Sequence, residues 1–109
     1  MEGRDTMAAD RVWTDEPIPP GETLADELAA RKMTQKALAQ KMGRPLQAVN
    51  EIVLGKKAIT AATALGLEKA LGVSAVTWMN LEAGYQLAKA RIEMRDAARR
   101  ARREARAHA

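Results

Sequence analysis

The side chains best suited to chemistry lie close together between Arg44 and Glu51. Gln47, Asn50 and Glu51 recur at spacings of three and four residues, which places them on one side of a predicted helix. An amide can bind adenine in a bidentate manner, a carboxylate can accept from cytosine N4, and Leu46 can contact a thymine methyl group. These residues predict contact with the base edges of duplex DNA. The alternative is that they only form the polar face of a surface helix.

Other polar residues near this helix are suited to binding phosphate. Lys56 and Lys57 follow it and can neutralise phosphates without reading sequence. Gln35 begins the preceding helix, where backbone N–H groups and the helix dipole favour an anion. For Lys41 and Lys69 we prefer a solvated role. The predicted phosphate contacts are Gln35, Lys36, Arg44, Lys56 and Lys57.

Two short helices joined by a tight turn, within 34–55, are expected to position these side chains. The hydroxyl of Thr34 can cap the first helix by accepting from a backbone N–H. Gly43 tolerates positive φ and can end that helix. Pro45 suits the first turn of the next helix, where a missing N–H costs nothing. This outline is that of a helix-turn-helix, whose second helix enters the DNA major groove.

Three further helices complete a predicted all-α fold. Apolar residues at helical spacing indicate one helix over 21–32, and Thr60 is expected to cap another that ends at Leu71. Ser74 is expected to cap the last helix, whose wide apolar stripe includes Trp78. After Arg95 the chain is rich in Ala and Arg, which favour a helix, but without an apolar seam this part is expected to fray.

The helix-turn-helix residues resemble those of the Xre, or lambda-repressor-like, family. The matching residues are Thr34-Gln35, Leu38-Ala39, Gly43, Val49, Ile52 and Gly55-Lys56. A wider resemblance to the HigA antitoxins spans about residues 18–92. It adds Ile18-Pro19-Pro20-Gly21-Glu22, Leu24, Trp78-Met79-Asn80-Leu81, Tyr85 and Leu87.

This resemblance implies a five-helix lambda-repressor-like domain with an extended C-terminal helix. It implies an antitoxin that binds double-stranded operator DNA as a homodimer, represses its own operon and neutralises a cognate HigB-like ribonuclease toxin. It also implies that the positions matching Leu46, Gln47, Asn50 and Glu51 face the bases. A stand-alone Xre repressor without a toxin remains an alternative, because the helix-turn-helix residues are the same in both.

The bulk composition excludes several other classes. A chain of 109 residues is expected to form one domain, with no cysteine for a disulfide or a thiolate site. No apolar run approaches the roughly 20 residues of a membrane span, and the N-terminus lacks a secretory signal core. His108, the single histidine, has no partner for a metal or a nucleophile. We therefore expect a cytoplasmic protein that is not an enzyme and that binds no cofactor, metal or membrane.

The charge is divided unevenly along the chain. Residues 1–29 carry eight negative and two positive charges, whereas 30–86 and 87–109 each carry eight positive and three negative ones. A basic middle is the expected footprint of a DNA reader, although a solvated surface gives the same excess. For the Arg-rich C-terminal end, we slightly prefer the role of a solvating extension to that of an adaptor that binds RNA or protein.

The expected organisation has three parts. Residues 1–20 form a flexible acidic segment, 21–92 the DNA-binding domain and 93–109 a basic tail. Trp13 either packs on the domain or contacts the toxin, to which the acidic segment would be attracted. The stripe of the last helix is longer than a small core needs, so its distal residues are expected to join two copies. The predicted dimer contacts are Tyr85, Ala88 and Ile92.

Overall fold

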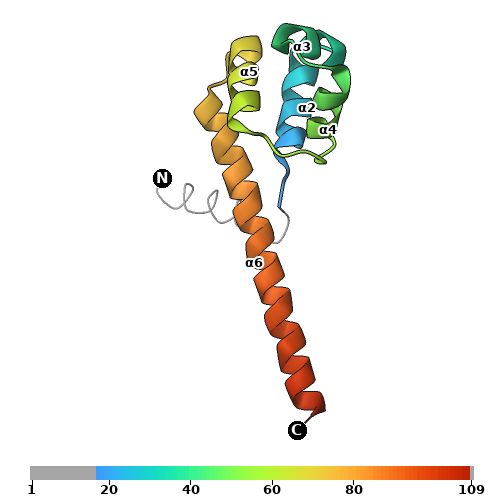
Figure 1. The fold of residues 1–109 in the computed structure, drawn as a ribbon, viewed down its shortest axis with the longest axis vertical. Helices are drawn as coiled ribbons and strands as arrows, with labels where there is room; N and C mark the ends of the chain where they lie inside the picture. The colour runs from blue at the N-terminus through green and yellow to red at the C-terminus, as the bar shows by residue number, and fades with distance from the viewer. Residues whose placement is uncertain (1–16, 109) are drawn as a thin grey trace. The chain divides into compact units, whose positions relative to one another are not determined.

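The computed structural model describes residues 17–108, and these contain five helices and no strand (Figure 1). The all-α fold predicted from the sequence is confirmed. Residues 18–83 form one unit, and the rest of the last helix, from Gly84 onward, belongs to another. The helices are α2 (Pro20–Ala30), α3 (Gln35–Met42), α4 (Leu46–Val53), α5 (Ala61–Leu71) and α6 (Ala75–Ala107).

Hydroxyl caps fix the starts of three helices. Thr34 Oγ1 accepts from the Ala37 amide at 3.0 Å at the start of α3. Thr60 and Ser74 do the same for α5 and α6, accepting from amides three residues later at 3.3 and 3.1 Å. Each bond satisfies a backbone N–H that has no partner inside its helix. All three caps predicted from the sequence are confirmed.

The turn between α3 and α4 uses a left-handed glycine. Gly43 has φ 67° and ψ 34°, and the next amide, that of Arg44, donates back to Ala39 O at 2.9 Å. A side chain is disfavoured in this conformation, which explains glycine here. Pro45 lies one position earlier than predicted. It precedes α4 with an extended ψ of 147° and its carbonyl accepts from the Ala48 amide, so it caps the helix from outside.

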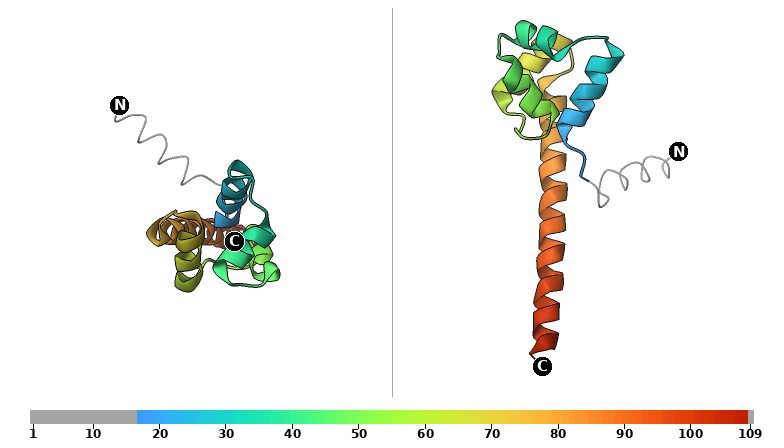
Figure 2. Two further views of the ribbon diagram at one scale, coloured as in Figure 1. Left: turned by 90° about the horizontal axis from the view of Figure 1, so that it is seen from above. Right: turned by 90° about the vertical axis from the view of Figure 1, so that its right-hand side faces the viewer.

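The core of residues 18–83 is aliphatic apart from one tryptophan. α4 packs against both α2 and α3, and α3 also packs against α5 (Figure 2). Trp78, in the first part of α6, is completely buried, and Leu81 packs beside the core as a partly buried residue. The other core residues are Leu24, Leu28, Leu38, Ala39, Val49, Ile52, Ile59, Ala64, Leu67 and Leu71.

A buried carboxylate fixes the loop between α4 and α5. Glu82 is only 7% exposed, and its Oε1 accepts from the backbone amide of Ile59 at 2.8 Å. Without this acceptor the buried Ile59 amide would lose its partner, at a cost of about 1–3 kcal/mol. Glu82 therefore ties the loop that follows α4 to the first half of α6.

The contact between α2 and α4 depends on a glycine without a side chain. Gly21 is buried, and a Cβ at this position would overlap the carbonyl oxygens of Ile52 and Val53. These carbonyls belong to the last turn of α4. Only glycine allows the start of α2 to approach the end of α4 this closely.

The last helix is extended, as the resemblance implied. α6 runs without interruption to Ala107, and the amide of His108 still donates to Glu104 O at 3.1 Å. The helix continues past Arg95 because Ala and Arg are among the strongest helix formers. Fraying of this part stays a prediction. No helix within residues 17–108 is both long enough and apolar enough to cross a membrane.

We predict opposite effects for alanine at two glycines. Gly21→Ala should lower the free energy of unfolding by about 1–3 kcal/mol, because the new methyl group overlaps backbone atoms of α4. Gly84→Ala should raise it by about 0.5–1 kcal/mol, because Gly84 lies inside α6 with nothing near its missing Cβ. Urea unfolding followed by circular dichroism measures both. Equal effects of the two substitutions would contradict the close approach at Gly21.

Candidate nucleic-acid interface

The two sides of α4 are chemically distinct. Val49 and Ile52 are 1% and 5% exposed and point into the core. Leu46 is 48% exposed, Gln47 is exposed, and Asn50 is partly exposed. Glu51, the fourth predicted base contact, is also partly exposed. The structure therefore places all four predicted base-contacting residues, Leu46, Gln47, Asn50 and Glu51, where they are accessible from outside the core.

A side-chain hydrogen bond links α3 to α4. Asn50 Nδ2 donates to Gln35 Oε1 at 3.1 Å. Asn50 keeps its Oδ1 and its second N–H, which are the groups needed for a bidentate contact with adenine. Gln35 keeps its amide N–H groups. The bond restricts the orientation of Asn50, a role for Gln35 that the sequence analysis did not anticipate.

The start of α3 provides a place for an anion. Gln35 and Lys36 are its first two residues, so their backbone N–H groups lie at the positive end of the helix. The Thr34 hydroxyl already satisfies the third amide, that of Ala37. Lys36 is exposed. A phosphate contact at this helix end stays a prediction.

The loop after α4 is held against the end of that helix. The carbonyl oxygen of Glu51 accepts from the amides of Lys56 and Lys57, at 2.8 and 3.2 Å. Both lysine side chains are exposed. These backbone hydrogen bonds thus hold two exposed cations next to the accessible side of α4.

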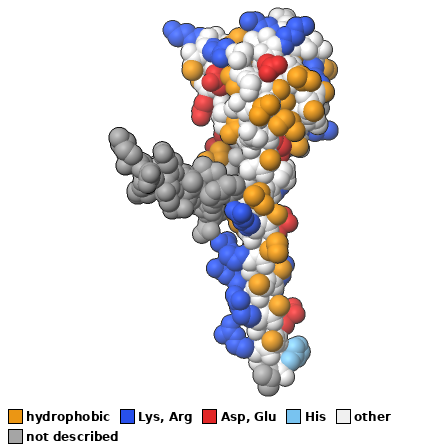
Figure 3. Space-filling view, turned by 90° about the vertical axis from the view of Figure 1, so that its left-hand side faces the viewer, with side chains coloured by type: hydrophobic (Ala, Val, Ile, Leu, Met, Phe, Trp, Pro, Cys, Tyr) orange, Lys and Arg blue, Asp and Glu red, His pale blue; other side chains and the backbone are white. Residues whose placement is uncertain are grey.

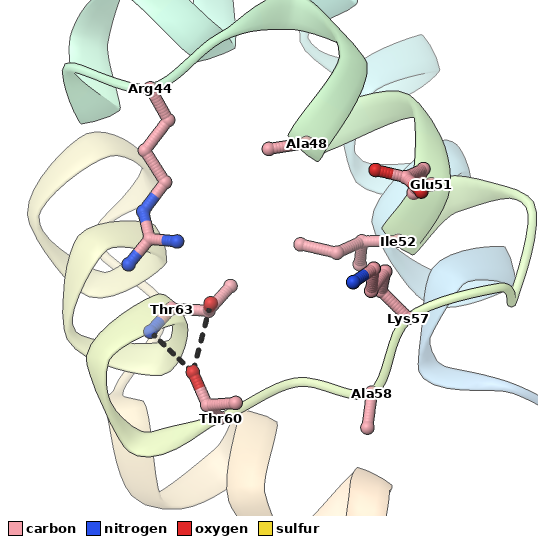
Figure 4. A pocket seen from close by; sticks show the side chains of 8 residues that line it. All are labelled: Arg44, Ala48, Glu51, Ile52, Lys57, Ala58, Thr60 and Thr63. Carbon is pink, nitrogen blue, oxygen red and sulfur yellow. Dashed lines mark hydrogen bonds between the residues drawn. The ribbon is translucent and has the colours of Figure 1, made fainter.

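A hollow of about 230 Å³ lies between α4, the following loop and the start of α5 (Figure 4). The Arg44 side chain borders it on the side of Thr60 and Thr63, and Glu51 and Lys57 lie across from them. It therefore has two cations and one anion on its walls. The hydroxyls of Thr60 and Thr63 are 3.1 Å apart. Its lining is Arg44, Ala48, Glu51, Ile52, Lys57, Ala58, Thr60 and Thr63.

Some residues of this surface were not predicted from the sequence. Leu54, just past α4, is 58% exposed. It lies seven positions after Gln47 and four after Asn50, so helical periodicity could have identified it. No pattern pointed to Thr60 and Thr63 as part of the hollow, because it depends on the packing of α5 near the loop.

The remaining predicted sites lie elsewhere. Of the predicted dimer contacts, Ala88 is 5% exposed, while Tyr85 and Ile92 are partly buried. The ammonium group of Lys89 lies 5.1 Å from the centre of the Tyr85 ring. Trp13 is outside the described residues. Within residues 17–108, no group of His, Cys, Asp or Glu side chains could hold a metal ion.

Comparisons with known proteins agree with this geometry. A family model described as helix-turn-helix matches residues 24–78. Virulence-associated protein I of Dichelobacter nodosus is 38% identical over 71 residues, which cover 64% of this chain and 66% of that protein.

Two solved structures are also similar. Antitoxin HigA of Pseudomonas aeruginosa, solved with the higBA promoter, is 39% identical, with a TM-score of 0.66 over 69% of this chain and 83% of HigA. An addiction module antidote protein of the HigA family from Coxiella burnetii is 36% identical, with a TM-score of 0.68 over 82% and 95%. This chain thus belongs to the Xre-type helix-turn-helix family, and its structural relatives include HigA-type antitoxins.

We predict that Gln35 and Asn50 stabilise the protein as a pair. Gln35→Ala and Asn50→Ala should each lower the free energy of unfolding, and the double variant should lose less than their sum by about 0.5–1.5 kcal/mol. Urea unfolding of the four proteins measures this coupling. As a control, Gln35→Ala combined with Asn80→Ala, which removes an exposed amide on α6, should be additive. Additivity in both pairs would argue against the hydrogen bond in solution.

Proposed function

We propose that this protein is a HigA-type antitoxin that binds operator DNA through α4, represses its own operon in the cytoplasm and neutralises a HigB-like ribonuclease toxin. The observation that carries the DNA-binding part is the accessible side of α4, where Gln35 orients Asn50 beside Gln47. Similarity to a HigA solved with its promoter supports this assignment. A stand-alone repressor is the alternative.

Base reading is assigned to the accessible side of α4. Gln47 and Asn50 are matched to adenine, Glu51 to the amino group of cytosine, and Leu46 to the thymine methyl group. Because α4 has only eight residues, its neighbours in the core must set its orientation. The backbone that carries these side chains is then already ordered before DNA binds.

Positioning on the duplex is assigned to phosphate contacts. The start of α3 offers Gln35 and Lys36, and the turn and loop that flank α4 offer Arg44, Lys56 and Lys57. Contacts on both sides of α4 would fix its depth and register in the groove. Their charge would add salt-dependent affinity that is the same for all sequences.

The base-reading assignment predicts a selective loss. Gln47→Ala should weaken operator binding by about 1–3 kcal/mol and change binding to an unrelated duplex little, because it removes one bidentate base contact. Fluorescence anisotropy with both duplexes at one salt concentration measures the ratio. Gln40→Ala, an exposed amide on α3, is the matched control. An equal loss on both duplexes would remove Gln47 from the base-reading set.

Dimerisation is assigned to α6. One short helix contacts few base pairs, whereas two copies about 34 Å apart would read a two-fold operator on one face of the DNA. Tyr85, Ala88 and Ile92 are proposed as the contacts, with Tyr85 and Ile92 providing most of the accessible surface because Ala88 is buried.

If α6 forms this dimer interface, the Ile92→Glu variant should be a folded monomer, because the new charge would lie in the interface without a partner. Operator affinity should fall by several orders of magnitude. Light scattering gives the mass, and circular dichroism checks the fold. Met94→Glu, on a side chain that is 73% exposed, should remain dimeric. The reverse result, with only Met94→Glu monomeric, would place the interface on the exposed side of α6.

Toxin binding is assigned to the acidic N-terminal segment with Trp13. The charge of residues 1–29 would attract a basic ribonuclease, and a buried tryptophan would anchor it. Co-expression with the neighbouring reading frame should give a complex with a small basic protein. A variant that begins at Pro20 should lose this partner but keep operator binding. Undiminished capture by the shortened chain would assign the toxin surface to the helical part.

A further inference from the structure

We propose that the distal end of α6 is a second nucleic-acid surface, which binds the phosphate backbone without reading sequence. This goes beyond operator recognition by α4 and does not depend on it. The surface consists of the five arginines Arg99, Arg100, Arg102, Arg103 and Arg106, which we call the arginine face.

The arginine face is dense and accessible. Five of the eight residues in 99–106 are arginines, and all five are exposed. Glu104 is the single acid in this range. Every cation here is an arginine, whereas the loop after α4 uses lysines. A guanidinium group binds phosphate with two parallel hydrogen bonds, which a lysine cannot do.

The helix separates the arginines from small apolar residues. At about 100° per residue, the arginines span an arc of about 160°, and the alanines of this segment lie on the opposite side. Figure 3 shows Lys and Arg side chains in one row along the distal part of α6 and hydrophobic side chains in another. The alanines are Ala97, Ala98, Ala101 and Ala105.

This arrangement places like charges beside each other. Arg99 and Arg103, and likewise Arg102 and Arg106, are four residues apart, a spacing at which like charges destabilise a helix. Only Arg100 has an acid four positions later, Glu104. The strong helix propensity of Ala and Arg offsets this repulsion and keeps the array in place. A polyanion would relieve the repulsion at several arginines together.

The residues on the side of α6 opposite the arginine face indicate which kind of polyanion this surface binds. Alanine offers no large apolar side chain for insertion into a membrane, where Leu, Phe or Trp would be expected. Residues 97–107 also contain no aromatic or large aliphatic anchor of the kind that dominates protein interfaces. Seven helical steps span about 10 Å, a length over which duplex DNA presents about six negative charges. Phosphate is therefore the ligand that the surface fits.

The test measures salt dependence with the full chain. In the variant with Arg99, Arg100, Arg102, Arg103 and Arg106 all changed to Gln, the charge is removed but helix propensity is nearly kept. Binding to an unrelated duplex, followed by anisotropy over a salt series, should show a slope of log K against log [salt] reduced by about 2–4, since each phosphate contact contributes about 0.9. Circular dichroism confirms that the helix remains.

A matched variant tests the other side of the helix. Ala98→Gln, Ala101→Gln and Ala105→Gln together change the same segment without changing its charge, and the slope should stay that of the natural chain. An unchanged slope in the folded arginine variant would overturn the proposal. If the slope stayed unchanged but the arginine variant lost binding to poly-L-glutamate, the arginines would instead bind an acidic protein surface.

Two further measurements identify the source of the phosphate and separate this proposal from operator reading. If the arginine face binds DNA beside the operator, longer flanks on the same duplex should raise affinity. If it binds a separate nucleic acid, the chain should link a labelled duplex to an immobilised one. Gln47→Ala should change the ratio of operator to unrelated binding and leave the salt slope unchanged, whereas the arginine variant should lower the slope and weaken binding to both duplexes alike, which leaves their ratio unchanged. Either effect can therefore fail while the other persists.

Discussion

The proposed reading of DNA bases depends on how an eight-residue helix is held. α4 is too short to be stable alone, because isolated helices below about 12–15 residues are marginal in water. Burial of Val49 and Ile52 therefore fixes the rotation of α4 about its own axis. The close approach of Gly21 fixes the position of its last turn. Since the inward positions are set by the core, the accessible ones follow by geometry. The orientation of Gln47 is thus a consequence of packing several residues away.

The polar contacts extend this control to the parts that flank α4. On one side, Gln35 at the start of α3 accepts from Asn50. On the other, the Glu51 carbonyl holds the loop that carries the two lysines, and Glu82 holds its far end through Ile59. A displacement of the loop would leave the buried Ile59 amide without an acceptor. The backbone of the proposed phosphate-contacting lysines is therefore held in place, although their side chains are exposed.

Local sequence signals predicted what is local in the structure. The hydroxyl caps and Gly43 were identifiable because a helix end requires particular groups within a few residues. The accessible positions of α4 followed from helical spacing. The bond between Gln35 and Asn50, however, joins residues fifteen positions apart, and the hollow needs α5 beside the loop. Such features depend on packing between elements, for which one sequence carries no direct signal.

The two basic surfaces differ in the way they are held, and this difference bears on what each can read. The lysines after α4 have backbones fixed by bonds to Glu51, next to side chains that match base edges. The arginine face lies on one side of α6, with alanines on the other side and no base-matching amide within it. A surface without such amides contributes charge but cannot discriminate bases. Under these proposals, specificity is assigned to α4, and the arginine face adds only affinity that depends on salt.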